Sequence, residues 1–107
     1  MLAKLESIEQ KFIELEQQLS LPDIFSDQEK YKKISKAHSE LAEIVTAFRQ
    51  YKKVLAEIDE NKELLKDKDP EIRDLAAMEL EGLKESKKGL EERLKILLIP
   101  RDPLDEK

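Results

Sequence analysis

Between Ser26 and Pro70 the chain contains neither proline nor glycine. Large side chains recur along this segment in steps of three and four residues, at Tyr31, Ile34, His38, Leu41, Val45 and Phe48. Such spacing places them on one side of an α-helix, as in the seam of a heptad pattern. A helix over about residues 27–66 would be about 60 Å long at about 1.5 Å per residue. The sequence therefore predicts an elongated, all-α protein.

Two features qualify this long helix. After Phe48 its apolar stripe shifts to a neighbouring side, at Tyr51, Leu55, Ile58 and Leu65. At the start, Ser26 precedes Glu29 by three residues, which is the spacing of a capping box. We therefore expect Ser26 to cap the helix N-terminus.

A first, shorter helix is predicted over about residues 2–20. Its apolar residues again follow steps of three and four, at Leu2, Leu5, Ile8, Phe12, Leu15 and Leu19. Pro22 disfavours helical geometry at the residue before it and so ends this segment. In the connection, Ile24 and Phe25 are expected to fold back under the helices.

A third helix is predicted over about residues 70–99. Asp69, Pro70 and Glu71 supply an acidic N-cap, a proline at the first helical position and an acid in the first turn. Gly82 and Gly89 lie seven residues apart inside it. They mark either a close approach to a neighbour or a loosened solvent face.

The short connection between residues 66 and 69 makes the helices that flank it antiparallel. The predicted fold is therefore an all-α domain over residues 1–99: a long antiparallel helical hairpin with a shorter N-terminal helix packed against one end. Residues 100–107 are expected to be a polar linker. Across the hairpin, we expect one apolar set to face another: Tyr31, Ile34, Leu41, Val45, Phe48 and Leu55 opposite Leu80, Leu83, Leu90 and Leu94.

The residue types argue against catalysis. The chain has no cysteine and one histidine, so neither a thiolate metal site nor a histidine cluster is available. No glycine-rich phosphate loop is present. We predict no cofactor, no metal, no catalytic residue and no enzymatic activity, with His38 packed and hydrogen-bonded on the apolar seam. No apolar run approaches the roughly 20 residues of a membrane span, and no signal peptide is recognised, so a cytoplasmic location is expected.

Charge is unevenly distributed along the chain. The formal net charge is −5, which argues against a general nucleic-acid clamp. Residues 28–53 nevertheless carry seven cations against three acids, and residues 57–81 carry four cations against ten acids. The basic segment either contacts RNA phosphates or is ordinary solubilising charge. Its cations are the candidate contact residues: Lys30, Lys32, Lys33, Lys36, Arg49, Lys52 and Lys53.

Several stretches together resemble the N-terminal domain of bacterial peptide chain release factors of type 1. The most specific is the end of the chain, Leu-Leu-Ile-Pro-Arg-Asp-Pro-Leu-Asp over residues 97–105. Weaker matches are the looped entry around Pro22, the Tyr-Lys-Lys-Ile-Ser-Lys stretch over 31–36, Tyr-Lys-Lys over 51–53 and Asp-Pro-Glu-Ile over 69–72. The resemblance covers the whole chain.

This resemblance implies a ribosome-docking domain of a factor that terminates translation at UAA and UAG codons. The implied partners are the stalk base of the large ribosomal subunit, both protein and rRNA, and the methyltransferase that modifies the glutamine of the family's Gly-Gly-Gln loop. Neither that loop nor the codon-reading tripeptide occurs in residues 1–107, so no catalytic residue is carried over. A monomer is expected. Two alternatives stay open: a tRNA-binding helical arm of an aminoacyl-tRNA synthetase, and a coiled-coil scaffold or chaperone subunit.

Overall fold

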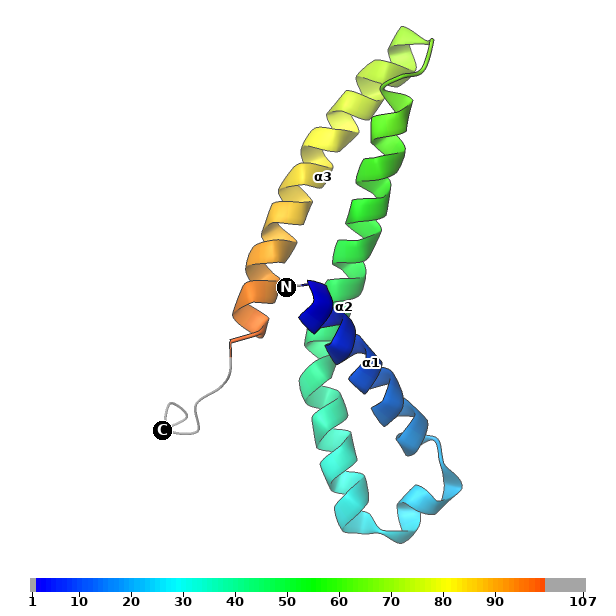
Figure 1. Cartoon of the computed structure of the whole chain (residues 1–107), viewed down its shortest axis with the longest axis vertical. Helices are drawn as coiled ribbons and strands as arrows, with labels where there is room; N and C mark the ends of the chain where they lie inside the picture. Colours follow the sequence, from blue (N-terminus) through cyan, green and yellow to red (C-terminus); the bar gives the residue numbers. More distant parts are fainter. Residues whose placement is uncertain (1, 100–107) are drawn as a thin grey trace. The chain divides into compact units, whose positions relative to one another are not determined.

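The computed structural model describes residues 2–99, and within them it contains helices only. Three α-helices, α1 (Leu2–Leu19), α2 (Gln28–Leu64) and α3 (Pro70–Leu97), are joined by a 3₁₀-helix, η1 (Pro22–Ser26), and a short turn (Figure 1). The predicted all-α class is confirmed, and the predicted helix bounds agree within two residues. The chain forms two compact units, residues 1–46 and residues 47–107, and α2 contributes to both. The predicted linker, residues 100–107, lies outside the described residues.

The first unit consists of α1, η1 and the first half of α2. Its core is a cluster of Leu15, Ile24 and Ile34, with partly buried neighbours packed against it: Leu19, Tyr31, Ala37 and Leu41. Figure 1 shows this half of α2 running back along α1 in the opposite chain direction. The prediction that Tyr31, Ile34 and Leu41 face the third helix is therefore wrong, because α1 and η1 cover that part of the stripe.

The connection between α1 and α2 also differs from expectation. Ile24 folds back into the core as predicted, whereas Phe25 is 68% exposed. Ser26 does not cap α2, because its hydroxyl donates to the Asp23 carbonyl at 2.6 Å and so belongs to η1. Asp27 takes the capping role, since its Oδ1 accepts the Lys30 backbone N–H at 3.1 Å.

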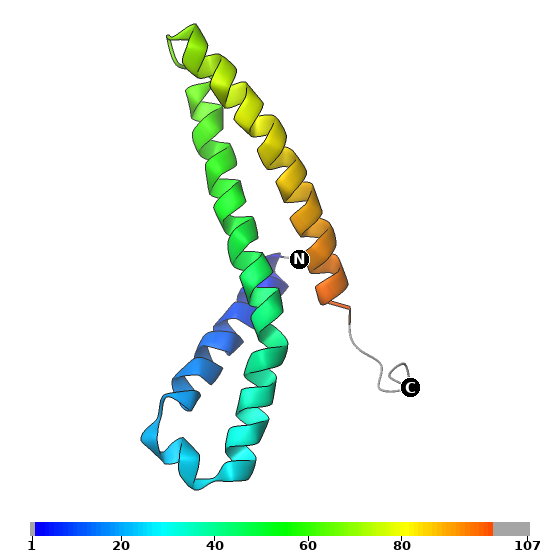
Figure 2. The same cartoon turned by 180° about the vertical axis from the view of Figure 1, so that it is seen from behind.

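The second unit is a helical hairpin made by the second half of α2 and by α3 (Figure 2). Ile58 of α2 packs with Leu80 and Leu83 of α3, and Val54 lies against this cluster. The turn is closed locally, as predicted for the start of α3: the Asp69 Oδ1 accepts the Glu71 N–H at 2.9 Å, and Pro70 follows the cap. This cap satisfies a helix N–H that would otherwise lack an intrahelical partner.

Gly82 and Gly89 lie on an open side of α3. A Cβ built at either glycine meets no atom within 4 Å, and neither has a positive φ. Of the two interpretations, the structure supports the loosened solvent face, because no atom of residues 2–99 approaches either position closely.

Candidate functional site

All seven predicted contact residues are exposed side chains of α2. The structure brings them together as two groups. Lys30, Lys32, Lys33 and Lys36 occupy the first turns of the helix, in the first unit. Arg49, Lys52 and Lys53 follow in the second unit. Within each group, neighbours three or four residues apart share a face of the helix.

In the second group, two lysines have defined surroundings. Lys52 Nζ lies 4.6 Å from the centroid of the Phe48 ring, and Phe48 is buried. Attraction between an exposed ammonium and an aromatic face contributes about 0.5–1 kcal/mol. Lys53 lines an open groove of about 560 Å³ between α2 and α3, with Gln50, Val54 and Glu57 on one side and Ser86, Gly89, Leu90 and Arg93 on the other.

The first group adjoins a hollow that sequence reasoning missed. Phe25, Gln28, Tyr31 and Lys32 line a space of about 500 Å³ where η1 meets α2. The Phe25 and Tyr31 ring centroids are 5.3 Å apart with the planes tilted by 36°. The sequence placed Phe25 in the core because it is apolar. The sequence signal that would have indicated an exposed Phe25 is its place just before the lysine-rich start of α2.

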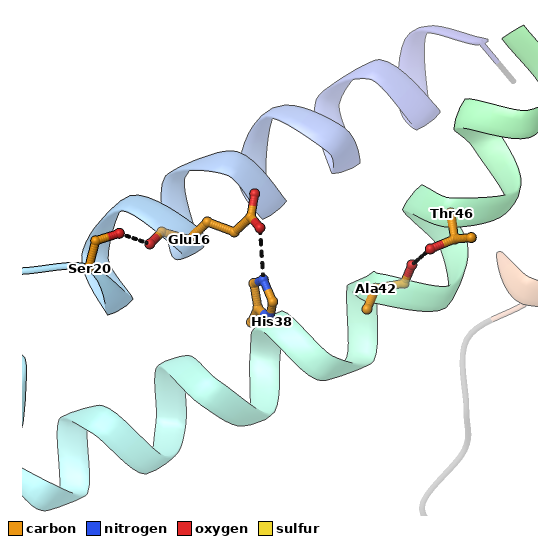
Figure 3. Close-up of polar contacts among 5 residues, drawn as sticks. All are labelled: Glu16, Ser20, His38, Ala42 and Thr46. Carbon is orange, nitrogen blue, oxygen red and sulfur yellow. Dashed lines mark hydrogen bonds and ion pairs between the residues drawn. The ribbon is translucent and has the colours of Figure 1, made fainter. Parts of the chain in front are cut away.

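His38 is packed as predicted, against a partner that only the fold defines. Its ring stacks on Phe12 of α1, with centroids 4.2 Å apart and planes 17° from parallel. Its Nε2 lies 3.6 Å from the Glu16 carboxylate, at ion-pair distance, and this buried nitrogen has no hydrogen bond (Figure 3). The predicted hydrogen bond is therefore absent at Nε2. The ring stack joins α1 to α2 at this point, with the Glu16 carboxylate beside the imidazole.

A second polar contact joins the helices of the hairpin. The Tyr51 hydroxyl donates to Glu91 Oε2 at 2.8 Å, across the second unit. Burial of the phenol, its hydrogen bond to Glu91 and the negative charge of that carboxylate all raise the pKa of Tyr51 above its ordinary value. Tyr51 therefore stays neutral and donates at physiological pH.

Within residues 2–99, no group of three or more acids or histidines is arranged to hold a metal ion. In the same part of the chain, no helix is long and apolar enough to cross a membrane. The candidate site is therefore the surface of α2, with its exposed cations and the hollow beside Phe25.

The described residues therefore form an all-α domain whose longest helix carries exposed cations. The chain belongs to the PCRF domain family, which matches residues 8–107. It is 55% identical over 107 residues to peptide chain release factor 1 of Solidesulfovibrio magneticus and 54% identical over 107 residues to that of Lawsonia intracellularis. Each alignment covers 100% of this chain and 30% of the relative. No solved structure matches the chain.

These comparisons confirm the resemblance to type 1 release factors and favour it over the synthetase arm and the scaffold. The chain spans about 30% of the length of the curated relatives it matches. The roles of the seven cations are tested by neither the fold nor the relatives, so those roles stay predictions.

Proposed function

We propose that this chain is the N-terminal, ribosome-docking domain of a class I peptide chain release factor of type 1. In this proposal the whole protein acts in the cytoplasm and directs termination at UAA and UAG codons, and residues 100–107 lead to its codon-reading and catalytic domains. The observation that carries the proposal is the match of the whole chain, at 55% identity, to a relative named peptide chain release factor 1.

The domain itself contributes binding and no hydrolysis in this proposal. Its partner is the stalk base of the large subunit, where cations of α2 contact rRNA phosphates and the adjoining surface contacts protein. The exposure of the seven cations supports this role, since phosphate contacts need side chains that reach outward. The release-factor glutamine methyltransferase is the second proposed partner.

Neutralising lysines in the full-length protein tests the docking role. Lys32, Lys33, Lys52 and Lys53 are changed together to Gln, and association with stop-codon-programmed ribosomes is followed by stopped flow. We expect slower association and a weaker dependence of binding on salt, because phosphate contacts release counterions. Single-turnover peptide release at saturating factor should change less, since the chemistry lies in other domains.

A matched control removes the same number of charges elsewhere. Lys62, Lys84, Lys88 and Lys95 are exposed lysines outside the basic segment. Their replacement by Gln should leave association closer to that of the wild type. Equal slowing by both quadruple variants would show that only overall charge matters, and unchanged association in the first variant would refute the docking role of α2.

A further inference from the structure

The hollow between η1 and α2 presents an aromatic ring to solvent from a fixed support. Phe25 is 68% exposed, although the preceding residue, Ile24, is 6% exposed and belongs to the core of the first unit. Within η1 the Ile24 N–H donates to the Leu21 carbonyl at 3.2 Å. The Ser26 hydroxyl closes the same short helix on the Asp23 carbonyl. The Phe25 backbone is therefore held on both sides, and binding at the ring does not have to order this segment of the chain.

The ring does not stand alone. The Tyr31 ring centroid lies 5.3 Å from that of Phe25, and Tyr31 is also packed against the core, so Phe25 and Tyr31 form one aromatic wall. Gln28 adds an amide that both donates and accepts hydrogen bonds. The space is about 500 Å³ and is partly open to solvent.

The positive charge around the hollow favours a ligand that combines a flat ring with a negative charge. Lys32 lines the hollow, none of the four lining residues is an acid, and Lys30, Lys33 and Lys36 lie within the same turns of α2. Three acids are near in the chain, Asp23, Asp27 and Glu29; none of them lines the hollow, and Asp27 is engaged as the helix cap. An aromatic face beside lysines is the combination by which proteins bind single-stranded nucleic acid, where bases stack and phosphates meet cations.

We propose that the hollow formed by Phe25, Gln28, Tyr31 and Lys32 binds an unpaired RNA base, which stacks on Phe25 while Lys32 contacts an adjoining phosphate. The proposal rests on the ribosome-docking function and gives it a specific contact. A base inside a duplex is stacked on its neighbours and leaves no free face for Phe25. The site therefore discriminates a loop or bulge from paired RNA.

The test uses the 107-residue chain and a short single-stranded RNA that carries one 2-aminopurine. Stacking on an aromatic ring quenches the fluorescence of this base. We expect the wild-type chain to quench it and to bind the single strand more tightly than a duplex of the same sequence. Phe25→Leu keeps apolar bulk and loses the π-face, so binding should weaken about fivefold or more, the lower range for loss of one base–aromatic stack.

Two matched variants separate stacking from general effects. Phe25→Tyr keeps the ring and should bind as the wild type does. Leu21→Ala removes another exposed apolar side chain of the same segment, outside the hollow, and should also leave binding unchanged. Helix content by circular dichroism should be the same in all variants, because Phe25 contributes little buried surface.

Three results would overturn the proposal: equal binding by Phe25→Leu and the wild type, equal affinity for duplex and single strand, and no RNA binding by the wild-type chain. The last result is also the one expected if the hollow holds an apolar side chain of a protein. These readouts are independent of the ribosome experiment. If the quadruple lysine variant associated with ribosomes as fast as the wild type while RNA binding still depended on Phe25, only the docking role would be refuted.

Discussion

Tyr51 illustrates how one side chain links helix packing to pH. Its ring is 5% exposed and its hydroxyl donates to Glu91 on the facing helix. Replacement by Phe keeps the ring and leaves the carboxylate without its donor. We expect Tyr51→Phe to lower the free energy of unfolding by about 1.5 kcal/mol near neutral pH, as for hydrogen bonds to charged groups. Urea unfolding measures this difference.

The same pair predicts a pH dependence of defined sign. The pKa of Tyr51 is raised in the folded chain, so the stability that its neutral form confers is present below the unfolded pKa of about 10. It is lost as the pH rises through the higher folded pKa, where two negative charges would face each other. The difference between wild type and Tyr51→Phe should therefore shrink above about pH 10. Tyr31→Phe is the matched control, and a difference that grows with pH would contradict this account.

Individual residues also show which features could be predicted from the sequence and which could not. The apolar spacing placed His38 on a packed face, which is correct, because helix periodicity alone fixes the side on which a residue lies. Its partners, Phe12 and Glu16, come from a helix more than twenty residues away and depend on how α1 crosses the face. Phe25 was misplaced because hydrophobicity predicts burial only on average.

At the scale of the helix, α3 carries two glycines that its own packing does not require. Glycine in a helix interior costs about 1 kcal/mol relative to alanine. Because a Cβ at Gly82 or Gly89 meets nothing within 4 Å and both have helical φ, alanine fits each position. We expect Gly82→Ala and Gly89→Ala each to raise the free energy of unfolding by up to about 1 kcal/mol, and the double variant to show their sum.

Urea unfolding of the two single variants and the double variant tests this expectation. Gly89 also lines the groove beside Lys53, whereas Gly82 does not, so Gly82→Ala serves as the reference. A decrease in stability on either substitution would mean that the chain itself needs the open space. A smaller increase in the free energy of unfolding for Gly89→Ala than for Gly82→Ala would indicate that the added methyl group disturbs packing in the groove.

The start of α2 shows why capping could be predicted only in part. Ser26 and Asp27 are both good caps, and the sequence spacing favoured Ser26 through Glu29. The choice was made by η1, which uses the Ser26 hydroxyl for its own closure and leaves the cap to Asp27. At α3 the same rules succeeded, since Asp69 stands directly before a proline and its carboxylate accepts the Glu71 N–H.

At the scale of the whole molecule, α2 changes its partner along its length. The sequence contained a sign of this, because the apolar stripe shifts after Phe48, close to the boundary between the units at residues 46 and 47. A stripe shows that a face is buried and leaves open which helix buries it. The expected hairpin is formed by the second unit, and the expected shorter N-terminal helix packs, together with η1, on α2 in the first unit.

This division of α2 leads to an expected oligomeric state. Its stripe is covered by α1 and η1 in the first unit and by α3 in the second, so neither half presents an unpaired seam of the kind that drives coiled-coil association. The net charge of −5 adds repulsion between copies. We expect sedimentation equilibrium at tens of micromolar to give a mass near 12.5 kDa.

A dimer mass would contradict this expectation and would direct attention to the exposed apolar residues of α3. Leu75 is 63% exposed and Met78 is 71% exposed, and at three residues apart they share one face. Leu75→Glu combined with Met78→Glu would then restore the monomer if this face joins the copies. Leu2→Glu, which changes another exposed apolar residue in the other unit, is the control. A dimer that survives the α3 substitutions would instead mean that a helix stripe exchanges between chains, and the separate packing of the two halves of α2 within one chain would have to be abandoned.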